Sequence, residues 1–145
     1  MMDDVVGGNP VYLLDAAEGM EDSLARVLDH VEGISAWTED QIPAHLSYGT
    51  SPRFPDVLVV ADSLWSVGTR KEPGRYSGGA HGYDPAYSAM HAIFYADGPA
   101  FRDGYVQAPF VNVEVYGIMT HVLGLEAAPN DGDLAHVEGM FSESH

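Results

Sequence analysis

The order of apolar and polar positions along the chain predicts four short strands. They are expected at 9–15 (NPVYLLD), 34–38 (ISAWT), 56–62 (DVLVVAD) and 92–98 (AIFYADG), where short apolar stretches are bounded by polar or turn-forming residues. The stretch 56–62 is continuously apolar between its two aspartates. That pattern is typical of a strand buried on both faces of a mostly parallel sheet.

Apolar residues spaced i, i+3, i+4 and i+7 predict two helices. The first spans 18–32 and ends at Gly33, and the second lies between Asn112 as a plausible N-cap and Gly124 at its C-terminal end. The spacing is set by Leu24, Val27, Leu28 and Val31 in the first helix and by Val115, Ile118, Met119 and Val122 in the second. Strands interleaved with helices predict a layered fold of α/β or α+β class, and the chain length predicts one domain over 1–145.

Two segments follow neither period. The proline-containing segment 39–55 is expected to be an irregular connection, and the glycine-rich segment 65–84, with its KEPGR turn, is expected to be a long loop. Loops of that length are uncommon in compact domains unless they serve a site. The core is expected to include Met90, Met119, Met140, Phe94, Tyr95, Phe110 and Tyr116, which fall in strand or helix patterns.

Composition narrows the function classes. Six basic residues against 22 acidic ones give a formal net charge of −16, which repels nucleic-acid phosphates and anionic membranes. An anionic substrate would also be repelled unless a bound cation reverses the local potential. The absence of cysteine excludes disulfides and thiolate ligands, so histidine and oxygen ligands must hold any metal. With no apolar stretch of membrane-spanning length and no signal-peptide pattern, we expect a soluble chain whose compartment is unassigned.

The tetrapeptide HGYD at 81–84 is the main candidate for chemistry. A neutral imidazole binds zinc well, and the glycines beside His81 allow the backbone to aim the ring into a cleft. A catalytic zinc site needs at least three ligands from protein, so His81 and Asp84 cannot form one alone. The alternative is an ordinary loop histidine with no ligand role.

Three other arrangements carry weaker signals. His91 lies about three helical turns from His81 if the segment is helical, too far for the two rings to share an ion. The NDGD stretch at 130–133 lacks the closing glutamate of a calcium loop and predicts a turn. No activating context of a nucleophile surrounds the hydroxyl residues Ser63, Thr69 and Ser77.

Two stretches read together, HGYDPAYSAMHAIFYADGPAF and APFVNVEVYGIMTHVLGLEAAPNDG, resemble the C-terminal portion of the nucleotide pyrophosphatase/phosphodiesterase family. This family is a branch of the alkaline phosphatase superfamily. The upstream stretch IPAHLSYGTSPRFPDVLVVADSLW is also similar, and the resemblance is most marked from Tyr48 to Gly132. It implies the C-terminal part of an alkaline-phosphatase-like sheet with flanking helices.

The resemblance also implies a chemistry. Family members hold two zinc ions and cleave phosphodiester or pyrophosphate bonds through a covalent phospho-enzyme formed on a threonine or serine. In this chain it implies a zinc-ligand role for His81 alone, with Gly82 and Asp84 completing the local pattern that shapes the loop. The family's nucleophile and its other zinc-binding pairs have no counterpart here. We therefore expect an incomplete site, weak zinc binding and no hydrolase activity by the chain alone.

Three roles are open at this point. The chain is a fragment or truncated form of a zinc phosphodiesterase, which we favour, or a non-catalytic domain that self-associates or captures a partner through an unpaired strand edge. The third role is one half of a split enzyme whose nucleophile half is a separate N-terminal part. In the complete enzyme the substrate would be a nucleotide or another phosphodiester.

Overall fold

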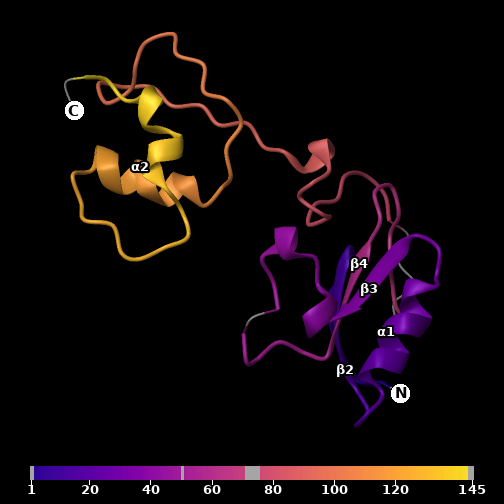
Figure 1. Cartoon of the computed structure of the whole chain (residues 1–145). Coiled ribbons are helices and arrows are strands. Elements are labelled where there is room, and N and C mark those ends of the chain that lie inside the picture. Colours follow the sequence, from indigo (N-terminus) through magenta and orange to yellow (C-terminus); the bar gives the residue numbers. More distant parts are fainter. Residues whose placement is uncertain (1, 50, 71–75, 144–145) are drawn as a thin grey trace. The chain divides into compact units, whose positions relative to one another are not determined.

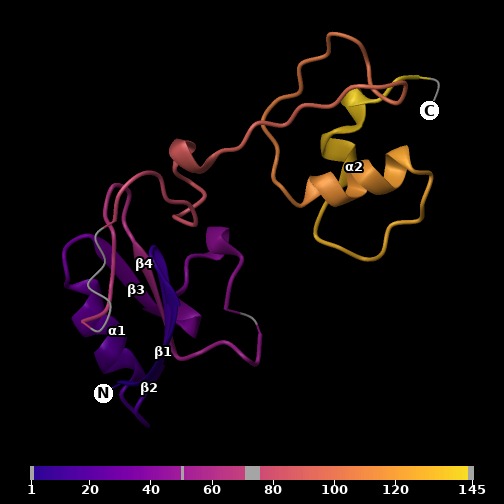
Figure 2. The same ribbon diagram turned by 180° about the vertical axis from the view of Figure 1, so that it is seen from behind.

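The computed structural model describes residues 2–49, 51–70 and 76–143, and the chain divides into two compact units. Unit 1 is Met1–Ala92 and unit 2 is Ile93–His145. Figures 1 and 2 show the ribbon of the chain from two sides. Each unit has its own apolar cluster. The expected KEPGR turn lies outside the described residues. The single domain expected over 1–145 stays a prediction.

Unit 1 is built on a four-stranded antiparallel sheet in the order β1-β2-β4-β3. The strands are β1 (Met2–Gly8), β2 (Val11–Ala16), β3 (Ile34–Thr38) and β4 (Val57–Ala61). β2, β3 and β4 lie where the sequence predicts strands. The edge strand β1 was not predicted, because its largely exposed residues show no apolar alternation.

The expectation of a mostly parallel sheet was wrong. Every residue of β4 is buried, as its apolar run predicts, but β4 pairs antiparallel with both neighbours. Leu58 lies opposite Leu13 on one side and Trp37 on the other. A continuous apolar run records burial of both faces and carries no information on strand direction, which is why the inference failed.

The helix α1 (Glu21–Asp29) packs on one face of this sheet (Figure 1). Its Leu24 and Ala25 join Leu14, Val57 and Val59 in the apolar cluster of unit 1. Burial of a leucine side chain such as Leu24 contributes about 2 kcal/mol. The predicted helix, 18–32, was too long at both ends. Val31, the last residue of the apolar pattern, lies beyond the helix and is half-exposed.

Gly33 does not end α1 as predicted. The helix ends at Asp29, and His30 caps it in the right-handed conformation. Gly33 instead has φ +86°, and a Cβ atom added there would lie 2.2 Å from the indole ring of Trp65. Trp65 therefore sits directly on the Gly33 backbone, at the start of the loop that leads to His81.

The outer edge of β3 is partly closed by side chains. The Asp29 carboxylate accepts a hydrogen bond from the Ala36 amide on this edge at 3.2 Å. On the paired side, the Ser35 hydroxyl donates to Asp62, the residue after β4, at 3.2 Å. Occupied amides and charged side chains along an edge discourage pairing with another chain.

Unit 2 centres on α2 (Glu114–Val122) and two short 3-10 segments, Leu134–His136 and Glu138–Met140. Its apolar cluster comprises Ile118, Val137, Met140 and Phe141, with Phe101, Phe110, Val122 and Leu134 packed against it. The predicted strand at 92–98 is not formed. Ile93 and Tyr95 are 93% and 85% exposed, because no strand lies beside this segment among the described residues of unit 2.

Further core assignments in unit 2 need correction. Met140 is buried as predicted, but Met119 is half-exposed, and Phe94 and Tyr116 are also exposed. These side chains belong to segments whose second apolar side has no covering layer within the unit. Apolar periodicity alone does not say which of two apolar sides is covered.

The two ends of α2 differ in how well the sequence predicts them. The helix begins after Val113 without a side-chain cap, so Asn112 is not its N-cap. At the other end the prediction is confirmed, because Gly124 has φ +64° and its amide donates to the His121 carbonyl at 3.0 Å.

A buried carboxylate holds the C-terminal segment against α2. Glu114, 2% exposed, accepts a hydrogen bond from the Asp133 amide at 2.6 Å and contacts His136 Nδ1 at 2.9 Å through its other oxygen. The predicted turn at 130–133 is formed, with the Gly132 amide donating to Asn130 Oδ1 at 2.8 Å. The turn thus delivers both partners to Glu114.

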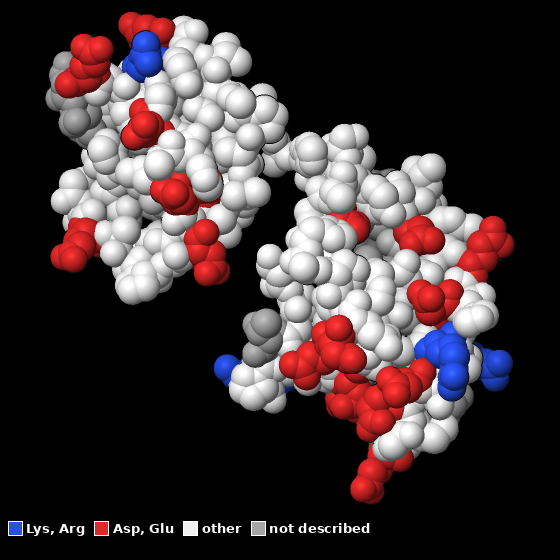
Figure 3. All heavy atoms as spheres, viewed as in Figure 1, with Lys and Arg blue, Asp and Glu red and all other residues white. Residues whose placement is uncertain are grey.

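The surface is acidic, as composition predicts. On the face drawn in Figure 3, acidic side chains are spread widely and basic ones are few.

The helices α1 and α2 have nine residues each. Within the described part of the chain, no helix has the length and apolar character needed to cross a membrane.

We expect Gly33→Ala to lower the free energy of unfolding by about 2–4 kcal/mol, because the added methyl group both disfavours the left-handed backbone and overlaps Trp65. Gly19→Ala is the matched control, since Gly19 has φ +73° but open space around it, and we expect about 1 kcal/mol there. Urea denaturation of the three proteins measures both. Equal losses would show that Trp65 does not press on Gly33.

A second prediction concerns the pH dependence of unit 2. The hydrogen bond with Glu114 raises the pKa of His136 above 6.5. Burial opposes this shift, and the charges of Glu114 and Asp133 add to it. The stabilisation by protonated His136 is therefore complete below about pH 6.5 and is lost as pH rises through the higher folded-state pKa.

In an NMR titration we expect Glu114→Gln to return the midpoint of His136 toward 6.5. Asp131→Asn, which removes a neighbouring exposed carboxylate, controls for the loss of one negative charge and should leave the midpoint high. A midpoint that moves equally in both variants would mean that the general acidity, rather than the contact with Glu114, sets the pKa of His136.

Candidate functional site

His81 lies at an exposed position of the segment that follows β4. In the described ranges 65–70 and 76–84 this segment contains no helix and no extended strand, in agreement with the predicted loop. Within the described residues, no hydrogen bond or ion pair involves the His81 imidazole. Both ring nitrogens are therefore available to a ligand from outside.

The three residues after His81 are each held in place. Gly82 has φ +93°, and a Cβ atom added there would lie 3.5 Å from Pro10 Cδ, so the backbone turns close to the proline ring. The Tyr83 hydroxyl donates a hydrogen bond to the Trp65 carbonyl at 2.8 Å. The structure thus presents an exposed histidine on an anchored turn.

Asp84 makes two further contacts. One carboxylate oxygen accepts a hydrogen bond from the Ala86 amide at 2.8 Å, and the other lies 2.9 Å from Nε2 of His45. Burial acts to raise the pKa of Asp84, but the hydrogen bonds from Ala86 and His45 and the charge of His45 outweigh it and hold the pKa below 3.8. Asp84 is therefore ionised at neutral pH, and its stabilising effect is lost only as pH falls through that lowered value.

The described residues do not by themselves fit a zinc ion. Across the described ranges, no three histidine or acidic side chains converge to hold a metal. His45 is engaged with Asp84, and His91 follows the short 3-10 segment Ser88–Met90 without joining His81 in a cluster. One exposed imidazole is fewer than the three protein ligands of a catalytic zinc site. A zinc ion at His81 would need its other ligands from outside the described residues.

Two of the hydroxyl candidates, Ser63 and Ser77, have no histidine base among their described contacts. A serine nucleophile needs a base within hydrogen-bonding reach. The described part of the chain therefore holds no assembled Ser–His pair at these two positions.

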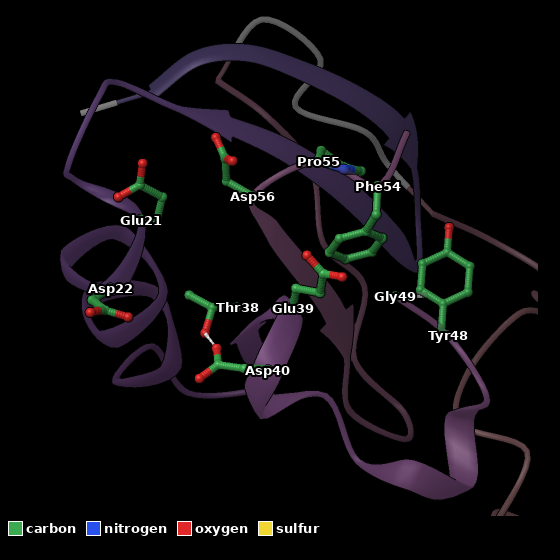
Figure 4. A pocket seen from close by; sticks show the side chains of 10 residues that line it. All are labelled: Glu21, Asp22, Thr38, Glu39, Asp40, Tyr48, Gly49, Phe54, Pro55 and Asp56. Carbon is green, nitrogen blue, oxygen red and sulfur yellow. Dashed lines mark hydrogen bonds between the residues drawn. The ribbon is translucent and has the colours of Figure 1, made fainter. Parts of the chain in front are cut away.

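A separate acidic hollow of about 530 Å³ lies in unit 1 (Figure 4). It is lined by Glu21, Asp22, Thr38, Glu39, Asp40, Tyr48, Gly49, Phe54, Pro55 and Asp56. Two of its carboxylates already serve the fold, since Asp40 accepts from the Thr38 hydroxyl at 2.6 Å and Asp56 from the Ala16 amide at 2.8 Å. No histidine lines the hollow, and His81 is not part of it. Its carboxylates attract cations in general, and among the described residues no histidine joins them.

Two histidine–carboxylate contacts were missed from the sequence, His45–Asp84 and His136–Glu114. The partners are 39 and 22 residues apart, so no local motif links them. His45 stands in the proline-containing segment 39–55, which the sequence marks only as an irregular connection. The stretches that carry the resemblance include His45 but end before His136, and they say nothing of either contact.

Comparison with known families gives a match over residues 8–84 to the type I phosphodiesterase / nucleotide pyrophosphatase family. The match reaches through the HGYD turn. Mouse bis(5'-adenosyl)-triphosphatase enpp4 is 35% identical over 120 residues, covering 83% of this chain and 25% of the relative. A venom phosphodiesterase of Crotalus durissus collilineatus is 38% identical over 97 residues, covering 67% of this chain and 12% of the relative.

Solved structures show the same likeness. Human ectonucleotide pyrophosphatase/phosphodiesterase 5 superimposes with a TM-score of 0.87 at 27% identity, covering 97% of this chain and 37% of that one. An inactive variant of the murine protein in complex with AMP gives a TM-score of 0.85 at 28% identity, covering 96% and 37%. The likeness confirms the predicted fold, mixed helix and sheet of the alkaline-phosphatase type. The chain spans between an eighth and two fifths of these relatives.

Proposed function

The chain belongs to the type I phosphodiesterase/nucleotide pyrophosphatase family, and we propose that it is the C-terminal part of a zinc-dependent hydrolase of phosphodiester or pyrophosphate bonds. The observation that carries this proposal is the family match over 8–84, which includes the HGYD turn. The breadth of the structural likeness, over nearly the whole chain, supports it.

The proposed substrate is a nucleotide. One relative is named as a bis(5'-adenosyl)-triphosphatase, and a structural neighbour was solved with AMP. A nucleotide carries negative charge, as does this chain at −16. The mutual repulsion supports a site in which bound cations reverse the potential near the substrate.

We assign His81 the role of one zinc ligand. Its imidazole is exposed and makes no hydrogen bond within the described residues, while Gly82, Tyr83 and Asp84 hold the turn that presents it. Zinc, when bound, supplies positive charge that stabilises the transferring phosphoryl group. The remaining ligands and the nucleophile come from outside this chain, so the chain alone is inactive.

The exposed side of α2 supports the proposal that a further part of the family domain covers this helix. Ile118 is buried in the unit 2 cluster, but Tyr116, Met119 and Leu123 form a second apolar stripe that is exposed. A helix that is apolar all round is normally buried on both sides. The proposed cover is the rest of a family domain, joined in one polypeptide or supplied as a separate half.

The same stripe favours one alternative, a non-catalytic domain that associates with itself or with another protein through this face. Such a domain has no need of a correctly presented His81. Activity restored by fusion to a catalytic half, and its dependence on His81, therefore separates the two functions.

The purified chain, supplied with zinc, is expected to show no turnover of a nitrophenyl nucleotide ester. The physical reason is that one histidine supplies too few ligands to hold a catalytic ion, since no three histidine or acidic side chains converge among the described residues. Spectrophotometric assay of released nitrophenolate measures the rate. Robust zinc-dependent turnover would contradict the proposed incompleteness.

A chimera tests the function itself. The 120-residue stretch of mouse bis(5'-adenosyl)-triphosphatase that aligns with this chain is replaced by the chain's own residues. We expect hydrolysis of the ester by the chimera and a loss of more than about a hundredfold on His81→Ala, because a ligand is removed.

His91→Ala in the same chimera is the matched control, a nearby exposed histidine that should tolerate the change. Circular dichroism confirms folding of each variant. An active chimera that is indifferent to His81→Ala would overturn the ligand role, and a folded but inactive chimera would favour the non-catalytic alternative.

A further inference from the structure

The contact between His45 and Asp84 links the HGYD turn to a distant segment of unit 1. His45 stands on the short 3-10 segment Ala44–Leu46, between β3 and β4, and its Nε2 lies 2.9 Å from Asp84 Oδ2. The two residues are 39 positions apart. His45 lies in the upstream stretch that resembles the family, but it is no part of the HGYD motif.

This contact differs in kind from the other anchors of the turn. Tyr83 bonds to the Trp65 carbonyl, which belongs to the same long loop, so that bond closes the loop on itself. Gly82 only lies against the Pro10 ring. Among the described contacts of residues 81–84, the one to His45 is the side-chain hydrogen bond that ties the turn to a segment outside its own loop.

The chemistry of Asp84 makes the tie specific. One oxygen is used by the Ala86 amide, which fixes the local turn, and the other is directed to His45. A carboxylate shared in this way cannot rotate without losing one of its two partners. His45 thereby limits the position of Asp84, and Asp84 lies three residues from His81.

We propose that His45 is a positioning residue that holds the HGYD turn, through Asp84, in the orientation that presents His81. The inference rests on the proposed function for its meaning, because presentation matters only if His81 is a ligand. Metal sites depend on such outer contacts to orient their ligands. His45 itself touches neither substrate nor metal.

The contact between His45 and Asp84 is expected to stabilise the turn rather than the whole unit. The side chains of His45 and Asp84 are 50% and 23% exposed, so solvent screens their attraction and global stability depends little on it. Its loss is felt by the turn and not by the sheet. An amide of the sheet can therefore serve as the internal reference for an amide of the turn.

Amide hydrogen exchange by NMR on the whole chain without zinc tests the proposal. The Ala86 amide, bonded to Asp84, reports on the turn, and the amide of Leu58 in β4 reports on the sheet. For His45→Ala we expect Ala86 to exchange about threefold to tenfold faster, the effect of losing one hydrogen bond, with Leu58 unchanged. Backbone relaxation at His81 should show increased motion in the same variant.

His45→Gln is the conservative variant, because the glutamine amide nitrogen can occupy the place of Nε2 and donate to the carboxylate. It should restore slow exchange at Ala86 and return the backbone motion at His81 to its original, lower level. His30→Ala is the matched control, since His30 is an exposed histidine of unit 1 whose ring contacts only the Arg26 carbonyl among the described residues. This control should leave the turn unchanged.

Three results would overturn the proposal. These are unchanged exchange at Ala86 in His45→Ala, failure of glutamine to restore it, or equal acceleration at Leu58, which would make His45 a general stabiliser. The outcome is independent of the chimera assay. An unaltered turn together with a His81-dependent chimera removes the role of His45 and leaves the proposed function intact.

Discussion

The burial of β4 constrains the rest of unit 1. β4 is paired on both edges, by β2 and β3, and covered on both faces, so its backbone and side chains have one arrangement that satisfies them. The chain that leaves β4 passes Asp62, whose amide donates to the Gly33 carbonyl at 2.9 Å, and then places Trp65 on Gly33. The loop carrying His81 therefore starts from the most rigidly defined part of the unit.

Sequence periodicity predicts the positions of most helices and strands, but it does not predict how the strands pair or which segments lack a partner. The positions of β3 and β4 and the glycine that closes α2 follow from local rules, because strand composition and left-handed caps are decided by neighbouring residues. Strand direction and the absence of a strand at 92–98 depend on partners far along the chain. The length of α1 fails for a related reason, since apolar spacing continues past the turn at which the sheet stops covering the helix.

In the candidate site, too, the sequence predicts one residue, His81, and misses another, His45. His81 could be singled out because a histidine between glycines stands in a recognisable motif, and the family match includes it. His45 could not, because its contact with Asp84 exists only once two separate segments have been brought together by the sheet. In the acidic hollow, two of the clustered carboxylates, Asp40 and Asp56, accept hydrogen bonds that serve the fold, so a cluster of acidic residues alone does not mark a site.

The carboxylate of Glu114 has a consequence for the covalent boundaries of the protein. Both of its partners, the Asp133 amide and His136, lie beyond the end of α2. A polypeptide that ended between α2 and Asp133 would keep the helical residues but would leave the carboxylate of Glu114, which is 2% exposed, without either partner. The buried carboxylate therefore ties the stability of α2 to the segment that follows it. A closed unit 2 needs the segment beyond His136 as well, since Val137, Met140 and Phe141 complete its apolar cluster.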